Sequence, residues 1–190
     1  MLDKAAKSAY DKARYRAIKI ARSPKPPKPP DIILLIAELD LIYLAGLLDG
    51  EGCFYITFIN HSARPVVSLQ MTHRGVVEWS ASLLGVGFQG SRRLNKPAHH
   101  ADQYGWKTSG RRAGLLCARL LPYLRVKAEQ ARLVIEICET IGATPAGRGQ
   151  QVSAEVIEQR LAMKARMHIL NNHGRAPLRF PTDENRWNAR

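Results

Sequence analysis

The sequence predicts an α+β domain in which a four-stranded antiparallel sheet carries helices on one face. Three observations predict this class. An apolar stretch rich in helix-forming residues precedes two short segments of β-branched and aromatic residues, the same order then returns in weaker form, and further helical stretches follow. The resulting order is αββαββα with one added helix, and strands that follow one another in pairs build an antiparallel sheet.

The first helix is expected at 32–48, where the chain is strongly apolar, and it stops at Asp49-Gly50-Glu51-Gly52. The first strand is expected at 53–59, and its side chains alternate between two faces. The inward face carries Phe54, Ile56 and Phe58, and the outward face carries Tyr55, Thr57 and Ile59.

The second strand follows a turn signal at 60–62 and is expected from Arg64 to Thr72. Alternation places Val67, Leu69 and Met71 inward and Arg64, Val66, Ser68 and Gln70 outward. A short helix over 75–84 is then expected to end at Gly85, because glycine favours the end of a helix.

The second half of the domain shows the same pattern less clearly. Strands are expected at 86–94 and 101–108, and helices at 111–121, at 127–141 with Gly142 as its stop, and at 153–172. The outward face of the sheet carries polar and aromatic side chains. That face is therefore predicted to be free to bind a partner.

The charge of the chain points to a polyanionic partner. The 190 residues carry a formal net charge of +13, and residues 1–30 alone hold six Lys and three Arg against two Asp. A solubilising surface or an anionic membrane partner are the alternatives. We divide the chain into a basic arm with a Pro-rich linker at 1–30, a domain at 31–175 and a C-terminal tail at 176–190. The arm is either a phosphate-binding extension or an inert tail.

Several classes of protein are excluded by simple patterns. No apolar run is long enough for a membrane span, and the N-terminus lacks the apolar core of a signal peptide. Cys53, Cys117 and Cys138 form no CxxC pair, so neither a disulfide framework nor a zinc site is predicted; we expect buried free thiols in a reducing, intracellular compartment. No glycine-rich nucleotide-binding pattern is present, and no small-molecule cofactor is expected.

One segment carries the features of a metal-dependent site. In Leu44-Ala45-Gly46-Leu47-Leu48-Asp49-Gly50-Glu51-Gly52, small residues at 45 and 46 permit close approach of a second helix, and the glycines at 50 and 52 permit a turn. Glu51 adds a carboxylate to the negative end of the helix dipole, which attracts a divalent cation. Two such helices packed side by side would bring two carboxylates together for phosphodiester cleavage.

This segment resembles the LAGLIDADG motif of homing endonucleases, with Leu48, Gly50 and Glu51 in place of Ile, Ala and the second Asp. A second stretch, Leu121-Pro122-Tyr123-Leu124-Arg125-Val126-Lys127, is similar to one that follows the fourth strand in that family. Only one motif copy is present, since the echo at Ala113-Gly114-Leu115-Leu116 lacks an acid. A single-motif chain must form a two-fold homodimer to pair its carboxylates.

The resemblance covers about 35–175 and implies a saddle-shaped sheet that lies in the major groove of double-stranded DNA. It implies Mg²⁺ held by Glu51 and the Gly50 carbonyl, Lys127 as the catalytic lysine, His73 as a group that orders water, and cleavage that leaves 3′ overhangs. The dimer contact would use Leu44, Ala45, Gly46 and Leu48. The expected DNA contacts are Tyr55, Thr57, Ile59, Arg64, Ser68, Gln70, Arg74, Arg92, Gln103 and Lys107.

Two other functions remain open on the same scaffold. The first is an RNA-splicing maturase, and the second is a DNA-binding regulator that does not cut. A pure binder does not require Glu51 and Lys127, and both are present. Cleavage of DNA from the gene's own intronless locus would separate the endonuclease from the maturase.

Overall fold

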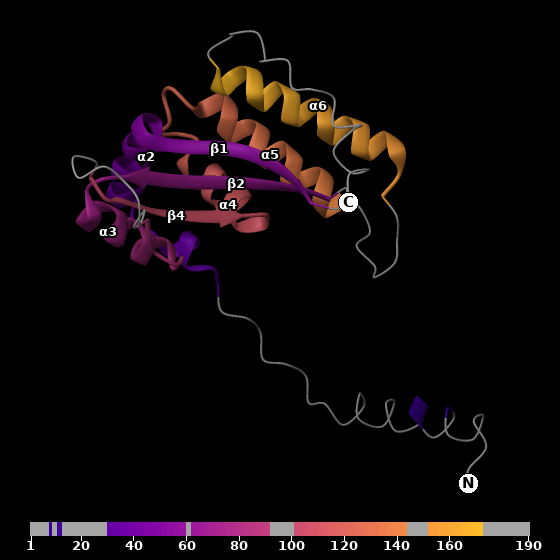
Figure 1. The fold of residues 1–190 in the computed structure, drawn as a ribbon, viewed down its shortest axis with the longest axis horizontal. Helices are drawn as coiled ribbons and strands as arrows, with labels where there is room; N and C mark the ends of the chain where they lie inside the picture. The colour runs from indigo at the N-terminus through magenta and orange to yellow at the C-terminus, as the bar shows by residue number, and fades with distance from the viewer. Residues whose placement is uncertain are drawn as a thin grey trace. The chain divides into compact units, whose positions relative to one another are not determined.

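A computed structural model describes residues 30–59, 62–91, 101–143 and 152–172, together with Ser8, Asp11 and Lys12 (Figure 1). Its sheet is antiparallel throughout, with the strand order β1-β2-β4-β3. The element order confirms the predicted α+β class. The elements are η1 (Ile32–Leu35), α2 (Glu38–Glu51), β1 (Gly52–Ile59), β2 (Ser62–Met71), α3 (Arg74–Leu84), β3 (Gln89–Ser91), β4 (Gln103–Ser109), α4 (Arg111–Leu120), α5 (Ala128–Ala143) and α6 (Ala154–Asn171).

The first helical region differs from the prediction at both ends. Asp31 caps a short 3₁₀ turn by accepting a hydrogen bond from the Ile33 N–H, and extended backbone at Ile36 separates this turn from α2. The α-helix therefore begins at 38 rather than 32. It also continues through Gly50 and ends at Glu51, because a glycine lowers the stability of a helix but can still be part of one.

Gly52 is needed for close approach and not for an unusual backbone conformation. Its backbone is extended, with φ −72° and ψ 151°. A Cβ atom at this position would lie 2.6 Å from the carbonyl oxygen and from Cδ2 of Leu48, which no side chain could tolerate. The expectation that Gly50 and Gly52 supply special turn conformations is therefore wrong, since Gly50 is helical.

The two faces of β1 and β2 follow the predicted alternation. Gly52 lies opposite Leu69 and Thr57 lies opposite Arg64, so the inward side chains of the two strands meet on one face. Val66 has an outward register opposite Tyr55, yet it is only 5% exposed. The small side chain is covered there because β2 is an inner strand with neighbours on both sides.

In the second strand pair, the first strand is shorter than predicted. β3 spans Gln89–Ser91 and β4 spans Gln103–Ser109, against expectations of 86–94 and 101–108. Residues 92–100, including Arg92, lie outside the described residues. In the same half of the domain α5 runs through Gly142 to Ala143, so Gly142 is not the helix stop that the sequence suggested.

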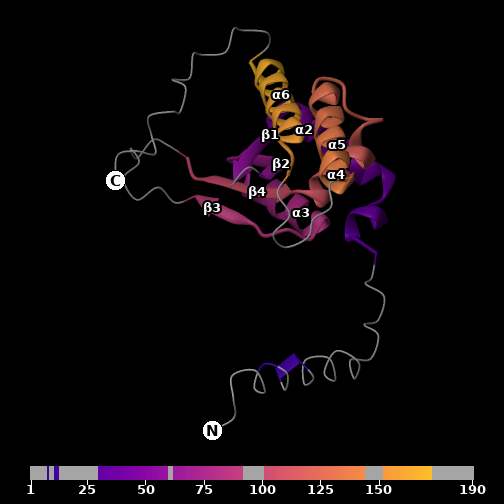
Figure 2. The ribbon, with the colours of Figure 1, turned by 90° about the vertical axis from the view of Figure 1, so that its right-hand side faces the viewer.

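The helices cover the inward face of the sheet. Figure 2 shows α4, α5 and α6 on one side of it, and their buried side chains form one hydrophobic cluster with Phe54, Leu69 and Trp106 from the strands. The buried indole N–H of Trp106 donates to the Ser80 hydroxyl of α3 at 2.8 Å, so this polar group is satisfied inside the core. Cys117 is buried and Cys138 half-buried, whereas Cys53 is exposed because its position in β1 points outward.

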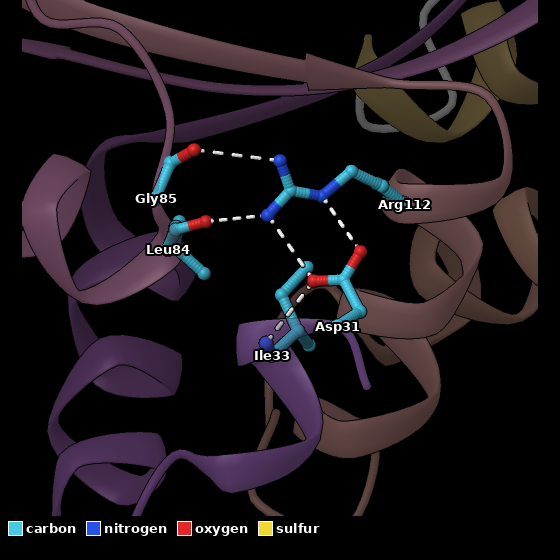
Figure 3. A network of polar contacts seen from close by, with 5 residues as sticks. All are labelled: Asp31, Ile33, Leu84, Gly85 and Arg112. Carbon is cyan, nitrogen blue, oxygen red and sulfur yellow. Dashed lines mark hydrogen bonds and ion pairs between the residues drawn. The ribbon is translucent and has the colours of Figure 1, made fainter. Parts of the chain in front are cut away.

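Arg112 fastens the start of the domain to two other elements (Figure 3). Its guanidinium contacts both carboxylate oxygens of Asp31 and donates to the carbonyls of Leu84 and Gly85 at the end of α3. Gly85 has φ 58°, the left-handed conformation that favours glycine at a helix end. This network joins η1, α3 and α4 at one point.

The chain divides into two compact units, Met1–Pro30 and Asp31–Arg190. Ser8, Asp11 and Lys12 of the first unit are helical. Apart from these residues and Pro30, the basic arm and the Pro-rich linker lie outside the described residues, as does the tail at 176–190. Among the described helices, none combines the length and the apolar composition needed to cross a bilayer.

Candidate nucleic-acid interface and active site

The outward face of the sheet gathers polar side chains from four strands. The register places eight of the residues expected to contact DNA on this face: Tyr55, Thr57, Ile59, Arg64, Ser68, Gln70, Gln103 and Lys107. The Gln70 amide donates to the Gln103 side chain at 3.3 Å, and the Thr57 hydroxyl donates to the Arg64 carbonyl. The hydrogen-bonding groups are therefore partly organised before any partner binds.

The sequence prediction missed two residues of β3 that lie on the same face. Gln89 lies opposite Gly105, and Ser91 lies opposite Gln103, so both share the outward register. No sequence signal could assign them, because the start of β3 and its register with β4 are set by tertiary pairing. Arg92, the residue after Ser91, was predicted to contact DNA and lies outside the described residues.

A hollow lies in this face around Gly105, lined by Gln70, Gln89 and Lys107. The backbone packing requires glycine at the centre of this hollow, because a Cβ atom on Gly105 would lie 2.7 Å from the Leu69 carbonyl oxygen. Amides and an ammonium that converge on a recess offer donors and acceptors to a ligand edge that enters it. The outward face of the sheet therefore has a recess as well as polar side chains.

Glu51 and Lys127 come together at the carboxyl end of α2. Glu51 is the last residue of the helix and is exposed. The Lys127 ammonium donates to the carbonyls of Leu48 at 3.0 Å, Gly50 at 3.2 Å and Gly52 at 2.7 Å. A positive charge here is favourable, because the last carbonyls of a helix carry its partial negative charge.

Asp49 holds the loop that carries Lys127. Its two carboxylate oxygens accept the backbone N–H groups of Arg125 at 2.7 Å and Lys127 at 2.8 Å. The sequence prediction gave Asp49 no role. Its contact partners are 76 and 78 residues away in the chain, so sequence position offered no signal for this link.

Burial lowers the pKa of the Lys127 ammonium, while the nearby carboxylates of Asp49 and Glu51 act in the opposite direction. The lysine therefore sits in a partly desolvated pocket surrounded by oxygen atoms. A cation in such a position interacts more strongly with an approaching phosphate than a fully solvated one would.

His73 has a structural contact that restricts its expected role. It precedes α3, and its Nδ1 atom accepts the Val76 N–H at 3.3 Å as a helix N-cap. A ring that accepts at Nδ1 carries its proton on Nε2 when neutral, so Nε2 can donate to water but cannot accept from it in this tautomer. The antiparallel register puts the end of β2, and with it His73, at the same end of the sheet as Gly52.

Arg74 lies on α3 and not on the sheet face. Its guanidinium pairs with Glu78 at 2.8 Å and lies 5.9 Å from the centre of the Phe88 ring and 6.0 Å from that of Tyr104. The contact with Glu78 raises the pKa of Arg74. The guanidinium is thus positioned by one carboxylate and two aromatic rings, next to His73 in the chain.

The oxygen atoms at the end of α2 fit a hard divalent cation. Glu51 offers an exposed carboxylate, and Gly50 offers a carbonyl beside it. The part of the chain that the structure describes contains no group of three or more His, Cys, Asp or Glu able to hold a metal ion. Mg²⁺ suits such a sparse site, since it keeps several waters and needs one or two carboxylates and substrate phosphates.

One face of α2 remains exposed and apolar. Leu39 is 80% exposed, Tyr43 is 55% exposed, and Ile42 and Gly46 lie on the same exposed side. Leu44, Ala45 and Leu48, which were expected at a dimer contact, are 0% exposed and pack into the chain's own core. Of the four residues expected at the dimer contact, Gly46 alone lies on the exposed side of α2, with Leu39, Ile42 and Tyr43.

Comparison with known proteins found no matching family model and no matching curated protein sequence. Solved structures do match. The homing endonuclease I-CvuI, bound to the I-CreI target with 2 mM Mg and the DNA not cleaved, gives a TM-score of 0.56 at 19% identity over 70% of this chain and 82% of its own. The archaeal intron-encoded homing endonuclease I-Vdi141I, complexed with DNA, gives 0.56 at 16% identity over 74% and 89%.

Proposed function

Because this chain has the fold of the LAGLIDADG homing endonucleases, we propose that it is a site-specific DNA endonuclease that needs a divalent cation and acts as a homodimer. The observation that carries the proposal is the meeting of Glu51 and Lys127 at the end of α2. An exposed carboxylate beside a lysine ammonium can hold a cation and stabilise charge on a phosphate. A protein that only binds DNA has no need of this pair.

The outward face of the sheet is the proposed DNA-reading surface. Its glutamines and Arg64 can make the bidentate contacts that distinguish adenine and guanine in the major groove, and Lys107 can contact phosphate. The net charge of +13 favours binding to a polyanion. Two copies related by a two-fold axis would read a long pseudo-palindromic site.

The active site would combine one Glu51 from each subunit. Glu51 and the Gly50 carbonyl would hold Mg²⁺, which when bound lowers the pKa of water and neutralises phosphate charge. Lys127 would stabilise the negative charge that develops on the cleaved phosphate. His73, with its proton on Nε2, would orient a water molecule by donating a hydrogen bond to it. Cleavage of both strands would leave 3′ overhangs.

The test of the function is cleavage of the DNA that the gene interrupts. The rejoined flanks of the gene should contain the target, so a linear fragment of the uninterrupted locus is incubated with the purified full chain in Mg²⁺ or in EDTA. We expect two defined fragments in Mg²⁺ alone. Binding without cleavage would favour the regulator, and splicing of the gene's own RNA would favour the maturase.

Replacing Asp49 with Asn should lower cleavage by about 10- to 100-fold without weakening DNA binding. Asn keeps one acceptor oxygen but replaces the other with a donor, so one N–H in the loop at 125–127 loses its partner, at a cost of about 1–2 kcal/mol of stability. Cleavage rates, DNA affinity and thermal unfolding are the measurements. Asp40→Asn, in the first turn of the same helix, is the matched control. Wild-type cleavage by the Asp49 variant would show that this link does not position Lys127.

Deleting residues 1–30 should weaken binding equally on all DNA sequences and leave the preferred site unchanged. The deletion removes six Lys and three Arg, and each lost phosphate contact makes the slope of log K against log salt shallower by about 0.9. Deletion of 176–190, which removes three Arg together with Asp183 and Glu184, is the control. Equal slopes for the shortened and full chains would mean that the arm makes no phosphate contacts.

A further inference from the structure

The Lys127 ammonium uses all of its donors within the chain. A lysine ammonium has three N–H groups, and three carbonyl oxygens accept from it, those of Leu48, Gly50 and Gly52. The same group cannot donate to a phosphate while all three contacts persist. The arrangement that the structure describes is therefore a resting arrangement, in which the lysine closes the end of α2.

The three contacts are not equal. The Gly52 carbonyl lies at 2.7 Å and the Leu48 carbonyl at 3.0 Å, whereas the Gly50 carbonyl lies at 3.2 Å and is the weakest partner by distance. Gly50 is also the residue next to Glu51, and its carbonyl is one of the two protein oxygens that suit a divalent cation. The ammonium and the cation would thus need the same oxygen atom.

We propose that the Lys127 ammonium is the resident cation at the carboxyl end of α2, and that a divalent cation displaces it from the Gly50 carbonyl. This inference rests on the proposed function, because it assumes that Glu51 holds the cation. Displacement frees one N–H of Lys127 for a phosphate oxygen. Binding of the divalent cation and the ability of Lys127 to contact phosphate are then coupled, because the cation releases the lysine from the Gly50 carbonyl.

Few negatively charged groups near the Gly50 carbonyl are available to hold two cations. The Asp49 carboxylate is occupied by two backbone N–H groups of the lysine loop, so Glu51 is the exposed carboxylate beside the Gly50 carbonyl. A divalent cation here must share the Glu51 carboxylate and the Gly50 carbonyl with an ammonium a few ångströms away. Removing the ammonium should therefore tighten divalent-cation binding, by about tenfold on Coulomb's law at high effective dielectric.

The experiment measures Mn²⁺ binding to the purified full chain without DNA, by the electron paramagnetic resonance signal of free Mn²⁺, so that no catalysis contributes. The proteins are the wild type, Glu51→Gln, Lys127→Met and the matched control Arg125→Met. Arg125→Met removes the same charge two residues away, where only the backbone N–H contacts Asp49. We expect weaker binding for the Glu51 variant, about tenfold tighter binding for the Lys127 variant, and no change for the control.

The outcomes separate the two proposals. Equal or weaker binding by Lys127→Met, with Glu51-dependent binding intact in the wild type, would overturn only the competition. Equal tightening by Arg125→Met would also overturn it, because long-range charge would then explain the effect. Binding by Glu51→Gln that equals binding by the wild type would overturn the proposed metal site and this inference together.

A second measurement needs no Lys127 variant to stay folded. An ammonium held by three carbonyls exchanges its protons slowly, so the wild type should show one protected lysine side-chain ¹H–¹⁵N signal. Saturating Mg²⁺ should shift this signal and speed its exchange with water, and the Glu51→Gln protein should show no such response. A protected signal that stays unchanged in the wild type at saturating Mg²⁺ would contradict displacement.

Discussion

Glu51→Gln is expected to reduce DNA cleavage by a factor on the order of 10³ or more while DNA binding persists. The amide keeps the shape of the side chain and removes the charge that would hold the cation. Under the proposed function, DNA affinity would rest instead on the outward face of the sheet and on the net positive charge. Cleavage and binding are measured on the same fragment in Mg²⁺ and in EDTA.

The variant should fold at least as well as the wild type. Glu51 is exposed at the carboxyl end of α2, where a negative charge is unfavourable to the helix dipole, so its removal should leave stability unchanged or raise it by a few tenths of a kcal/mol. Glu158→Gln, exposed on α6, is the control for a carboxylate lost elsewhere. Full cleavage by the Glu51 variant in Mg²⁺ would refute the active-site assignment.

The sequence predicted the parts of the fold that depend on local pattern. Alternation in β1 and β2 assigned the outward Tyr55, Thr57 and Arg64, because a strand repeats every two residues and one face of this sheet is buried. The assignment of Glu51 and Lys127 to one active site came from resemblance, and in the structure the Lys127 ammonium contacts the carbonyl of Gly50, next to Glu51. The chemical roles of these residues remain predictions.

The failures have a common physical origin in helix phase and long-range contacts. α2 is apolar on all sides, with Leu39 and Tyr43 exposed and Leu44 and Ala45 buried, so its periodicity could not reveal which side faces the core. Asp49 bonds to a loop that is remote in sequence. The N-cap role of His73 was missed because the helix begins at Arg74, one residue before the predicted start, and because histidine is an uncommon cap.

Replacing Gly46 with Leu should abolish or strongly weaken the homodimer while leaving the single chain folded. A Cβ built on Gly46 has no atom within 4 Å beyond its own stretch of helix, so the new side chain starts into open space, and α2 gains helix propensity of about 0.8 kcal/mol. A two-fold axis through this face would instead place the new side chain against its symmetry mate. Overpacking costs about 1–3 kcal/mol per site, hence about 2–6 kcal/mol for the pair, or 30-fold and more in dimer dissociation.

The two readouts should therefore move in opposite directions, with the chain more stable and the assembly weaker. Sedimentation measures the dimer dissociation constant, and thermal unfolding measures the stability of the chain. Cleavage should fall with the dimer because each proposed active site would need Glu51 from both subunits. Gly142→Leu is the matched control, an exposed glycine in α5 that is equally free of neighbours. A wild-type chain that sediments as a monomer on its own and on its target, yet still cuts both strands, would refute the shared site. A Gly46 variant that dimerises normally would place the interface on another face.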